Sequence, residues 1–409
     1  MNEAATTRAE RILALRRARM AVSSPFLRGA FRPFFFMGPL WAVVALTIWL
    51  CTLAGVFVLP STLDPLAWHR HEMLFGFVGA VVAGFLLTAI PNWTGRLPIA
   101  GKPLAALAGL WLVGRPALLF SQHLGALAAA VLDVAFYGVL ATVAGCEVIA
   151  AKNRNLPVVG LVLLFGVANA LDHAAGAGLI GDPDLGWRAA VSLVVLMISL
   201  IGGRIIPSFT RNWMTKQGIE GGLPGQPTRF DLGVIGITAL ALMVWVAAPD
   251  ARVGAWALIG AGLLQMIRLA RWRGWRTSRD PLVLILHVGY LWVPAGLLLV
   301  GGYGLGALAF RSAAIHALTA GAMATMILAV MSRATLGHTG HALKAGSPTV
   351  LAYILITVGA VLRVVAPLGL VDYTLGMEAA ALCWGGALLL FLAAYGPMLF
   401  SARVDNPQG

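Results

Sequence analysis

The sequence predicts an all-α integral membrane protein with twelve transmembrane helices. Of its 409 residues, 59% are hydrophobic and only 11% are charged, whereas a soluble domain carries about 25% charged residues. The charges cluster between apolar runs of ~20 residues, and each run is long enough to cross a ~30 Å hydrocarbon core as a helix. A mean hydropathy of +0.86 also indicates that the lipid bilayer is the solvent of this chain.

Twelve apolar runs follow one another along the chain, and we predict a span for each. They cover residues 34–58, 69–90, 104–120, 125–149, 157–178, 187–206, 232–248, 253–271, 281–301, 308–331, 349–368 and 376–400. The domain organisation that follows is a cytoplasmic segment 1–33, a twelve-helix domain 34–403 and a cytoplasmic tail 404–409. The connections are too short to hold an extramembrane catalytic domain.

The charges of the connections give the orientation. One set of connections is basic and contains Arg96 and Lys102; Lys152 and Arg154; Arg211, Lys216 and Arg229; Arg271, Arg273, Arg276 and Arg279; Arg333 and Lys344. The alternating set contains Asp64; Asp182 and Asp184; Asp250; and Asp372. Cytoplasmic loops carry the excess of Lys and Arg, so the basic set and both termini are predicted to be cytoplasmic. A miscounted helix would exchange the two sets partway along the chain, and no exchange occurs.

The N-terminal segment is basic and contains interspersed apolar residues. Its arginines are Arg8, Arg11, Arg16, Arg17 and Arg19, and Ile12, Leu13 and Leu15 lie between them. No short apolar stretch with a cleavage site follows directly, so a secretory signal is not indicated. The pattern predicts an amphipathic segment on the cytoplasmic membrane surface.

Composition and motifs exclude several classes of function. The net charge of +13 comes from short loops beside apolar runs, which is the pattern of membrane orientation and not of nucleic-acid binding. The three cysteines, Cys51, Cys146 and Cys383, lie singly in apolar segments and form no disulfide framework. The chain has no Gly-rich phosphate loop and no His-Glu-x-x-His motif.

A weak internal repeat links the second and tenth spans. A histidine is followed at equal offsets by a glycine and a Thr-Gly pair: His71, Gly76 and Thr94-Gly95, then His316, Gly321 and Thr339-Gly340. The sixth span has a fainter copy, with Trp187 at the place of the histidine. The pattern predicts three parallel units of four helices, unlike the inverted repeats of many transporters. Chance matching among Gly- and Ala-rich helices is the alternative.

Six of the eight histidines fall within or near the predicted spans: His69, His71, His173, His287, His316 and His338. Ionisable groups in a membrane are costly and usually face an interior site or partner. Neutral imidazole is also a good ligand for copper, iron and zinc. The predicted orientation gathers His69, His71, His173 and His316 in the outer half of the membrane. His123 and His341 lie in loops and are interpreted as structural.

These histidines are candidate metal ligands, in a definite order. Positions i and i+2 of a helix do not share a face, so only one of His69 and His71 points directly into the bundle. His71 and its repeat counterpart His316 are the first choice, and His173, His287 and His69 follow. For each residue taken alone, the alternative is a buried histidine that forms hydrogen bonds and binds no metal.

Other polar residues in the spans are candidate partners of such a site. They are Glu72 after His71, Asn169 and Asp172 before His173, and Tyr290, which shares a helix face with His287. Arg115 and Arg363 lie at equivalent places of the repeat and require an anionic partner. That partner is one of Glu72, Asp133, Glu147 and Glu378, or a heme propionate. Arg333 either contacts a cofactor or extends to lipid headgroups.

Short motifs occur along nearly the whole chain. They are Phe31-Arg32-Pro33-Phe34-Phe35, Trp68-His69-Arg70-His71-Glu72, Pro91-Asn92-Trp93-Thr94-Gly95-Arg96, Arg204-Ile205-Ile206-Pro207-Ser208, His287-Val288-Gly289-Tyr290, and Ser332-Arg333-Ala334-Thr335. Together these motifs resemble the NnrS family. The resemblance implies a multi-pass protein of the bacterial inner membrane that contains copper and heme, the latter of the b type. It also implies a role in the response to nitric oxide, around denitrification and nitrosative stress.

We therefore expect a membrane metalloprotein whose buried histidines hold heme and copper. Nitric oxide, the candidate ligand, is small and apolar enough to arrive through the lipid bilayer. Reduction, detoxification and sensing of nitric oxide all fit this expectation, and the sequence names no electron donor. One alternative is a transporter whose intramembrane His, Arg, Asp and Glu line a substrate path. Another is a membrane anchor that only docks a partner.

Overall fold

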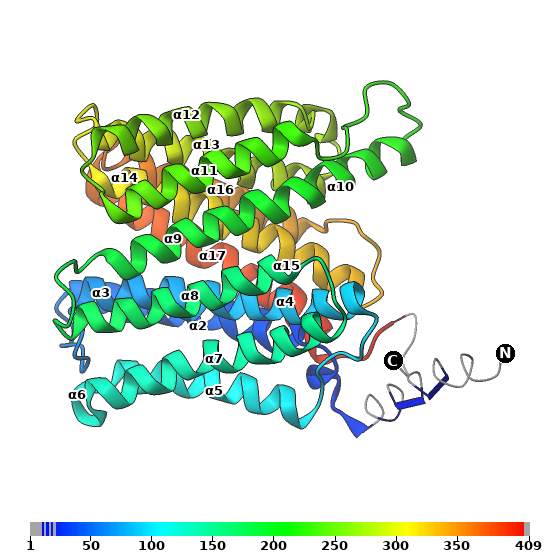
Figure 1. Cartoon of the computed structure of the whole chain (residues 1–409), viewed down its shortest axis with the longest axis horizontal. Coiled ribbons are helices and arrows are strands. Elements are labelled where there is room, and N and C mark those ends of the chain that lie inside the picture. The colour runs from blue at the N-terminus through cyan, green and yellow to red at the C-terminus, as the bar shows by residue number, and fades with distance from the viewer. Residues whose placement is uncertain (1–9, 12–13, 16–17, 19–21, 405–409) are drawn as a thin grey trace. The chain divides into compact units, whose positions relative to one another are not determined.

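The computed structural model describes residues 10–11, 14–15, 18 and 22–404, and the described chain is helical and contains no strand (Figure 1). This confirms the predicted all-α class. Residues 1–9, 12–13, 16–17 and 19–21 of the predicted N-terminal segment, and residues 405–409 of the predicted tail, lie outside the described residues.

Eleven helices of the described chain are long and apolar enough to span a membrane. They are Phe31–Leu53, Pro65–Thr94, Ala126–Ala150, Leu156–Gly176, Leu185–Lys216, Arg229–Ala247, Arg252–Ala270, Pro281–Gly304, Arg311–His338, Ser347–Val365 and Tyr373–Phe400. Each has the length that a hydrocarbon core requires. The chain is therefore a multi-pass membrane protein.

A further helix, α5 (Lys102–Leu119), occupies the remaining predicted span, 104–120. It is not among the eleven, because Lys102 and Arg115 lower the hydropathy of a helix of only 18 residues. A helix thus forms at every predicted place, and the crossing of the membrane by α5 remains a prediction.

Unit 1, the first of two compact units, consists of the described residues of Met1–Pro183, Ala334–Ala342 and Leu392–Gly409. Its elements are η1 (Pro25–Leu27), α2 (Phe31–Leu53), the continuous α3 (Pro65–His71), η2 (Glu72–Val78) and α4 (Gly79–Thr94), α5, α6 (Ser121–Leu124), α7 (Ala126–Ala150) and α8 (Leu156–Gly176). Within this unit α7 packs along α5 and α8, and α4 packs against α2 and α7 (Figure 1).

Unit 2 consists of Asp184–Arg333 and Leu343–Phe391. Its elements are α9 (Leu185–Met197), η3 (Ile198–Gly202), α10 (Gly203–Lys216), α11 (Arg229–Ala247), α12 (Arg252–Ala270), η4 (Gly274–Thr277), α13 (Pro281–Gly304), α14 (Arg311–His316), η5 (Ala317–Met323), α16 (Ser347–Val365) and the larger parts of α15 (Ala324–His338) and α17 (Tyr373–Phe400), whose last residues belong to unit 1. In this unit α12 packs along α11 and α13, and η5 packs against α13 and α16. Two units are found where three four-helix units were predicted, so the repeat stays a prediction.

Two helices run well past their predicted ends. Helix α10 continues to Lys216, although its span was predicted to end at residue 206, and α15 continues to His338, although its span was predicted to end at residue 331. The predictions stopped where the apolar run stops, but backbone hydrogen bonds continue the helix through polar residues. His338, which lies beyond the predicted span 308–331, is therefore the last residue of α15.

Three of the described helices contain a π-helical segment, namely η2, η3 and η5. A π segment widens the helix and is frequent at functional sites. The three segments lie in the second, sixth and tenth predicted spans. In two of them the segment begins directly after a histidine, His71 or His316.

Side chains from neighbouring helices bind the carbonyl groups of η2. The Tyr137 hydroxyl donates to the carbonyl of Phe75 at 2.5 Å, and Trp111 Nε1 donates to the carbonyl of Gly76 at 3.0 Å. Two glycines give Tyr137 its room, because a Cβ at Gly79 would collide with the hydroxyl and a Cβ at Gly166 would lie 2.7 Å from Tyr137 Cβ. Helices α5, α7 and α8 thereby hold the segment that follows His71.

Replacement of Tyr137 by Phe should destabilise the protein by about 1–3 kcal/mol, because the buried carbonyl of Phe75 would lose its donor. The measurement is the unfolding midpoint of the full chain in detergent. Tyr373→Phe is the matched control, because Tyr373 is 59% exposed and its substitution should leave the midpoint unchanged. Equal midpoints for both variants would contradict the role given to Tyr137.

Candidate metal centre

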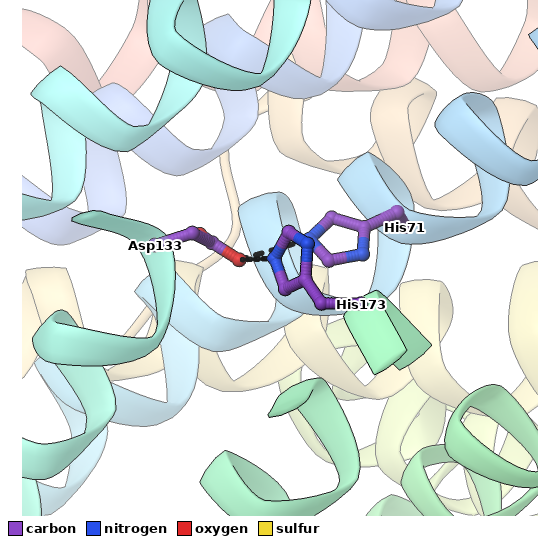
Figure 2. Close-up of side chains that lie close together, drawn as sticks. All are labelled: His71, Asp133 and His173. Carbon is purple, nitrogen blue, oxygen red and sulfur yellow. Dashed lines mark hydrogen bonds and ion pairs between the residues drawn. The ribbon is translucent and has the colours of Figure 1, made fainter. Parts of the chain in front are cut away.

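Two histidines and one aspartate converge inside unit 1. His71 Nε2 lies 2.9 Å and His173 Nε2 lies 3.0 Å from the same atom, Asp133 Oδ2. Their candidate ligand atoms all lie within 4.8 Å of one another. Figure 2 shows both imidazole rings beside the carboxylate, with dashed lines joining them.

Three elements of unit 1 supply these side chains. His71 is the last residue of α3, Asp133 lies in α7, and His173 lies near the end of α8. His71 and Asp133 are 0% exposed. His69 lies two residues earlier and points elsewhere, with its ring stacked on Trp49 at a centroid distance of 4.0 Å. This agrees with the helical geometry that separates positions i and i+2.

Asp172 sets the orientation of the His71 ring. Its Oδ2 lies 2.9 Å from His71 Nδ1, on the side of the ring away from Asp133. A neutral imidazole has a single N–H, so it cannot donate to both carboxylates. If Nδ1–H donates to Asp172, the lone pair of Nε2 is available to a metal ion beside Asp133. A carboxylate behind a metal-bound histidine is a common outer contact.

The carboxylates of the centre are only partly neutralised. Arg115 donates to Glu72 Oε2 at 2.5 Å and forms a second, shorter contact with Asp133 Oδ1. The carboxylates of Glu72, Asp133 and Asp172 are all buried, and Arg115 contacts the first two. When all three are ionised and both imidazoles are neutral, as in metal ligands, Arg115 leaves two negative charges. Arg70, at the rim, offsets part of that excess. Buried charges require compensation, so the centre suits a divalent cation.

Three oxygen atoms at the centre are buried without a hydrogen-bond partner. They are Glu72 Oε1, Asn169 Oδ1 and Asp172 Oδ1, and all three can act as acceptors. Asn169 uses its amide nitrogen to donate to Asp133 Oδ2 at 2.7 Å. Buried polar atoms normally have a partner, so an excess of acceptors again favours a cation or the water bound to it.

The spacing of the donor atoms fits a single metal ion. Ligands about 2.1 Å from a metal stand roughly 3.0 Å from each other at 90° and about 3.4 Å at the tetrahedral angle. The distances of 2.9 and 3.0 Å between Asp133 Oδ2 and the two imidazole nitrogens are hydrogen-bond lengths, and small shifts of these side chains would bring all three atoms to a metal ion. Two histidines and a carboxylate are a donor set for zinc, copper and non-heme iron.

Two other predicted metal ligands, His287 and His316, lie in unit 2, and each has a polar contact within that unit. His287 Nε2 lies 2.8 Å from the Thr210 hydroxyl, and His316 Nδ1 donates to the carbonyl of Ser312 at 2.8 Å. The expectation that His316 shares a site with His71 and His173 stays a prediction. Arg363 donates to the Ser312 hydroxyl at 3.2 Å.

Two predicted cofactor contacts of unit 2 have protein partners. The Tyr290 hydroxyl donates to Gln265 Oε1 at 2.7 Å and accepts from Arg268 at 2.9 Å. The Arg333 guanidinium lies 4.1 Å from the ring centroid of Phe209. A cation–π contact of this kind satisfies an arginine without a cofactor.

Unit 2 has a second buried ion pair, between Arg268 and Asp231 at 3.0 Å. Arg268 also donates to the carbonyl and the hydroxyl of Ser199, each at 3.0 Å. Gln265 and Tyr290 complete this network, which pairs one carboxylate with one buried guanidinium. Because its charges balance, it has no demand for a cation.

Asp133 is the metal-centre residue that the sequence argument placed only as a possible partner of an arginine. Its position carried a usable signal, since Asp133 is a carboxylate inside the apolar run 125–149. Ionisable residues within spans commonly mark functional sites. What the sequence could not give is the distance between Asp133 and two histidines that lie 62 and 40 residues away.

The fold and the site together define a class, a multi-pass helical membrane protein with a buried His-His-Asp centre able to hold a metal. The particular family follows from comparison with known proteins. Residues 25–403 match the sequence model of the NnrS family, described as NnrS protein, and the chain belongs to that family. The resemblance in the motifs is thus confirmed over nearly the whole chain. No individual curated protein matches it.

Replacement of Arg115 by Gln should destabilise unit 1 by about 3–5 kcal/mol, because Glu72 and Asp133 would stay buried without their cation. The measurement is again the unfolding midpoint in detergent. Adding Glu72→Gln to the Arg115→Gln variant should restore part of the loss by removing one uncompensated charge. A double variant less stable than the single one would contradict this account of the ion pair.

Proposed function

We propose that the chain is a membrane metalloprotein of the nitric oxide response that holds one metal ion between His71, Asp133 and His173. The observation that carries this proposal is the convergence of their three ligand atoms within 4.8 Å, beside the buried carboxylates of Glu72 and Asp172. The family resemblance implies copper, and two imidazoles with a carboxylate are suitable donors for copper. Nitric oxide would reach the centre through the lipid bilayer.

Within such a centre each residue has a separate task. His71 and His173 would bind the ion through Nε2, and Asp133 would bind it through Oδ2. Arg115 holds the other carboxylate oxygen of Asp133, which favours binding through one oxygen. Asn169 adds a hydrogen bond to Asp133 Oδ2. The ion would supply a redox-active centre that binds nitric oxide, whether for reduction, detoxification or sensing.

The family resemblance also implies heme, for which we propose His316 and Arg363 as the binding residues. A neutral His316 that donates Nδ1–H to the carbonyl of Ser312 carries its lone pair on Nε2, as an axial ligand does. Arg363 reaches the hydroxyl of the same serine and is a suitable partner for a propionate. Bound heme would supply a second metal centre, an iron centre with affinity for nitric oxide.

These two assignments predict separate losses of cofactor. His71→Ala and His173→Ala should each lower the copper content of the purified protein at least about tenfold, while the Soret band of heme persists. His316→Ala should remove the Soret band and leave copper in place. The measurements are metal analysis and optical absorption.

His341→Ala is the matched control, because His341 contacts Thr339 outside the centre, and it should keep both cofactors. If both unit 1 histidine variants retain wild-type copper, the proposed centre is wrong. If the wild-type protein has neither copper nor a Soret band, the metalloprotein class fails and the transporter alternative gains. The position of His71 between two carboxylates is compatible with a transporter, because series of Asp, Glu and His side chains also form the proton relays of transporters.

We further propose that the protein lies in the bacterial inner membrane with twelve spans and both termini in the cytoplasm. Support comes from the helix α5 at the twelfth predicted place and from the alternating charges of the connections. Reporter fusions should place the C-terminus and the connection containing Lys152 inside, and the connection containing Asp182 outside. If fusions at Lys152 and Asp182 report the same side, the proposed topology is wrong.

A further inference from the structure

We propose that Asp172 and Arg70 form an outer chain that positions His71 and connects the charge of the metal centre to the rim of unit 1. The inference rests on the proposed metal centre. It adds two positioning residues, neither of which binds the ion, and it predicts that they act in opposite directions.

The first step of the chain is the contact between Asp172 and His71. Asp172 Oδ2 lies 2.9 Å from Nδ1 of a ring whose Nε2 faces Asp133. With a metal ion at Nε2, the single hydrogen of the neutral ring lies on Nδ1, and it is donated to Asp172 because a carboxylate accepts. Asp172 therefore favours Nε2 of His71 as the metal-binding atom and holds the rotation of the ring. The outer carboxylate also raises the basicity of the imidazole toward a metal.

The second step leads from Asp172 toward the surface of unit 1. Arg70 Nη2 lies 3.9 Å from Asp172 Oδ1, with side-chain exposures of 25% for Arg70 and 5% for Asp172. Asp172 thus uses one oxygen for the histidine and turns the other toward a partly exposed cation. Arg70 is also the chain neighbour of His71 in α3, so one turn of helix supplies both the ligand and the outer cation.

The two residues should tune a bound ion with opposite signs. The negative charge of Asp172 stabilises the more highly charged state of a metal, here Cu(II) over Cu(I). The positive charge of Arg70 opposes Asp172 and favours Cu(I). Interactions between charges are strong in a buried, low-dielectric site and weaker near solvent. The effect of Asp172 should therefore exceed that of Arg70.

Unit 2 contains a matched pair that serves as the control. Asp231 is buried beside Arg268, and Arg271 Nη1 lies 3.9 Å from Asp231 Oδ2 with side-chain exposures of 42% and 6%. The geometry resembles that of Arg70 and Asp172, but the inner partner of the aspartate is an arginine instead of a histidine. Substitutions there change similar charges without touching the proposed centre.

The experiment compares four variants of the full chain, purified in detergent and loaded with copper alone. They are Asp172→Asn and Arg70→Gln, with Asp231→Asn and Arg271→Gln as controls. The Cu(II)/Cu(I) midpoint potential is measured by redox titration, followed by the EPR signal of Cu(II), and copper affinity is measured by competition with a chelator.

We expect Asp172→Asn to raise the midpoint potential, to change the EPR signal and to weaken Cu(II) binding about 10–100-fold. Arg70→Gln should lower the potential by a smaller amount, and both controls should match the wild type. If the potentials of the two unit 1 variants shift with the same sign, or if Arg70→Gln does not shift the potential, the proposed roles of Asp172 and Arg70 are wrong. A role of Asp172 in folding alone predicts an unchanged potential and EPR signal in whatever copper-loaded protein remains.

The failure of this inference can be told apart from failure of the centre itself. If His71→Ala and His173→Ala keep the wild-type copper affinity and EPR signal, the proposed metal centre is wrong. The proposed roles of Asp172 and Arg70 are then wrong as well. If those variants lose copper while Arg70→Gln leaves the potential unchanged, the centre stands and the outer chain alone is rejected. Arg70 is partly exposed, so its variant remains informative even if Asp172→Asn does not fold.

Discussion

The carboxylate of Asp133 is the constraint around which unit 1 is organised. It is fully buried in α7 and receives contacts from Arg115 of α5, His71 of α3, and both Asn169 and His173 of α8. A charge buried in this way is tolerated only when its neighbours compensate it. One side chain thus fixes how three other helices meet α7, and the π segment after His71 is held by side chains from two of the same helices, Trp111 of α5 and Tyr137 of α7.

Unit 2 repeats this arrangement with the charges exchanged. In unit 1 the arginine lies on α5 and the aspartate on α7, whereas in unit 2 Asp231 lies on α11 and Arg268 on α12. In both units the arginine lies beside a π segment: Glu72 is in η2, and Ser199 is in η3. A repeat of four helices would produce this pattern, although the fold divides into two units. The histidine positions differ, since Tyr290 contacts the unit 2 pair where imidazoles contact Asp133.

The sequence was sufficient for the fold class and for the positions of the helices, because the apolar runs and the charges between them follow directly from the bilayer. It was less informative about helix ends, as α10 and α15 show, since hydrogen bonds carry a helix beyond its apolar part. It ranked His71 and His173 among the ligands but paired His71 with His316 by periodicity. The sequence did not identify Asp133 as a ligand, because no pattern in a single sequence shows that His71 and His173, 62 and 40 positions away, contact it.

The two units differ in the balance between their buried carboxylates and buried guanidinium groups, and this difference bears on whether the charges serve stability or function. Buried ion pairs are weak evidence for stability, because desolvation offsets much of their attraction. The neutral pair of Asp231 and Arg268 already satisfies unit 2 with one carboxylate and one buried guanidinium. Unit 1 instead buries Glu72, Asp133 and Asp172 with Arg115, together with oxygen atoms that have no donor. If both imidazoles are neutral, these carboxylates outnumber the buried guanidinium, and stability alone would favour removal of one of them. Their position beside two imidazoles therefore supports the proposed metal centre.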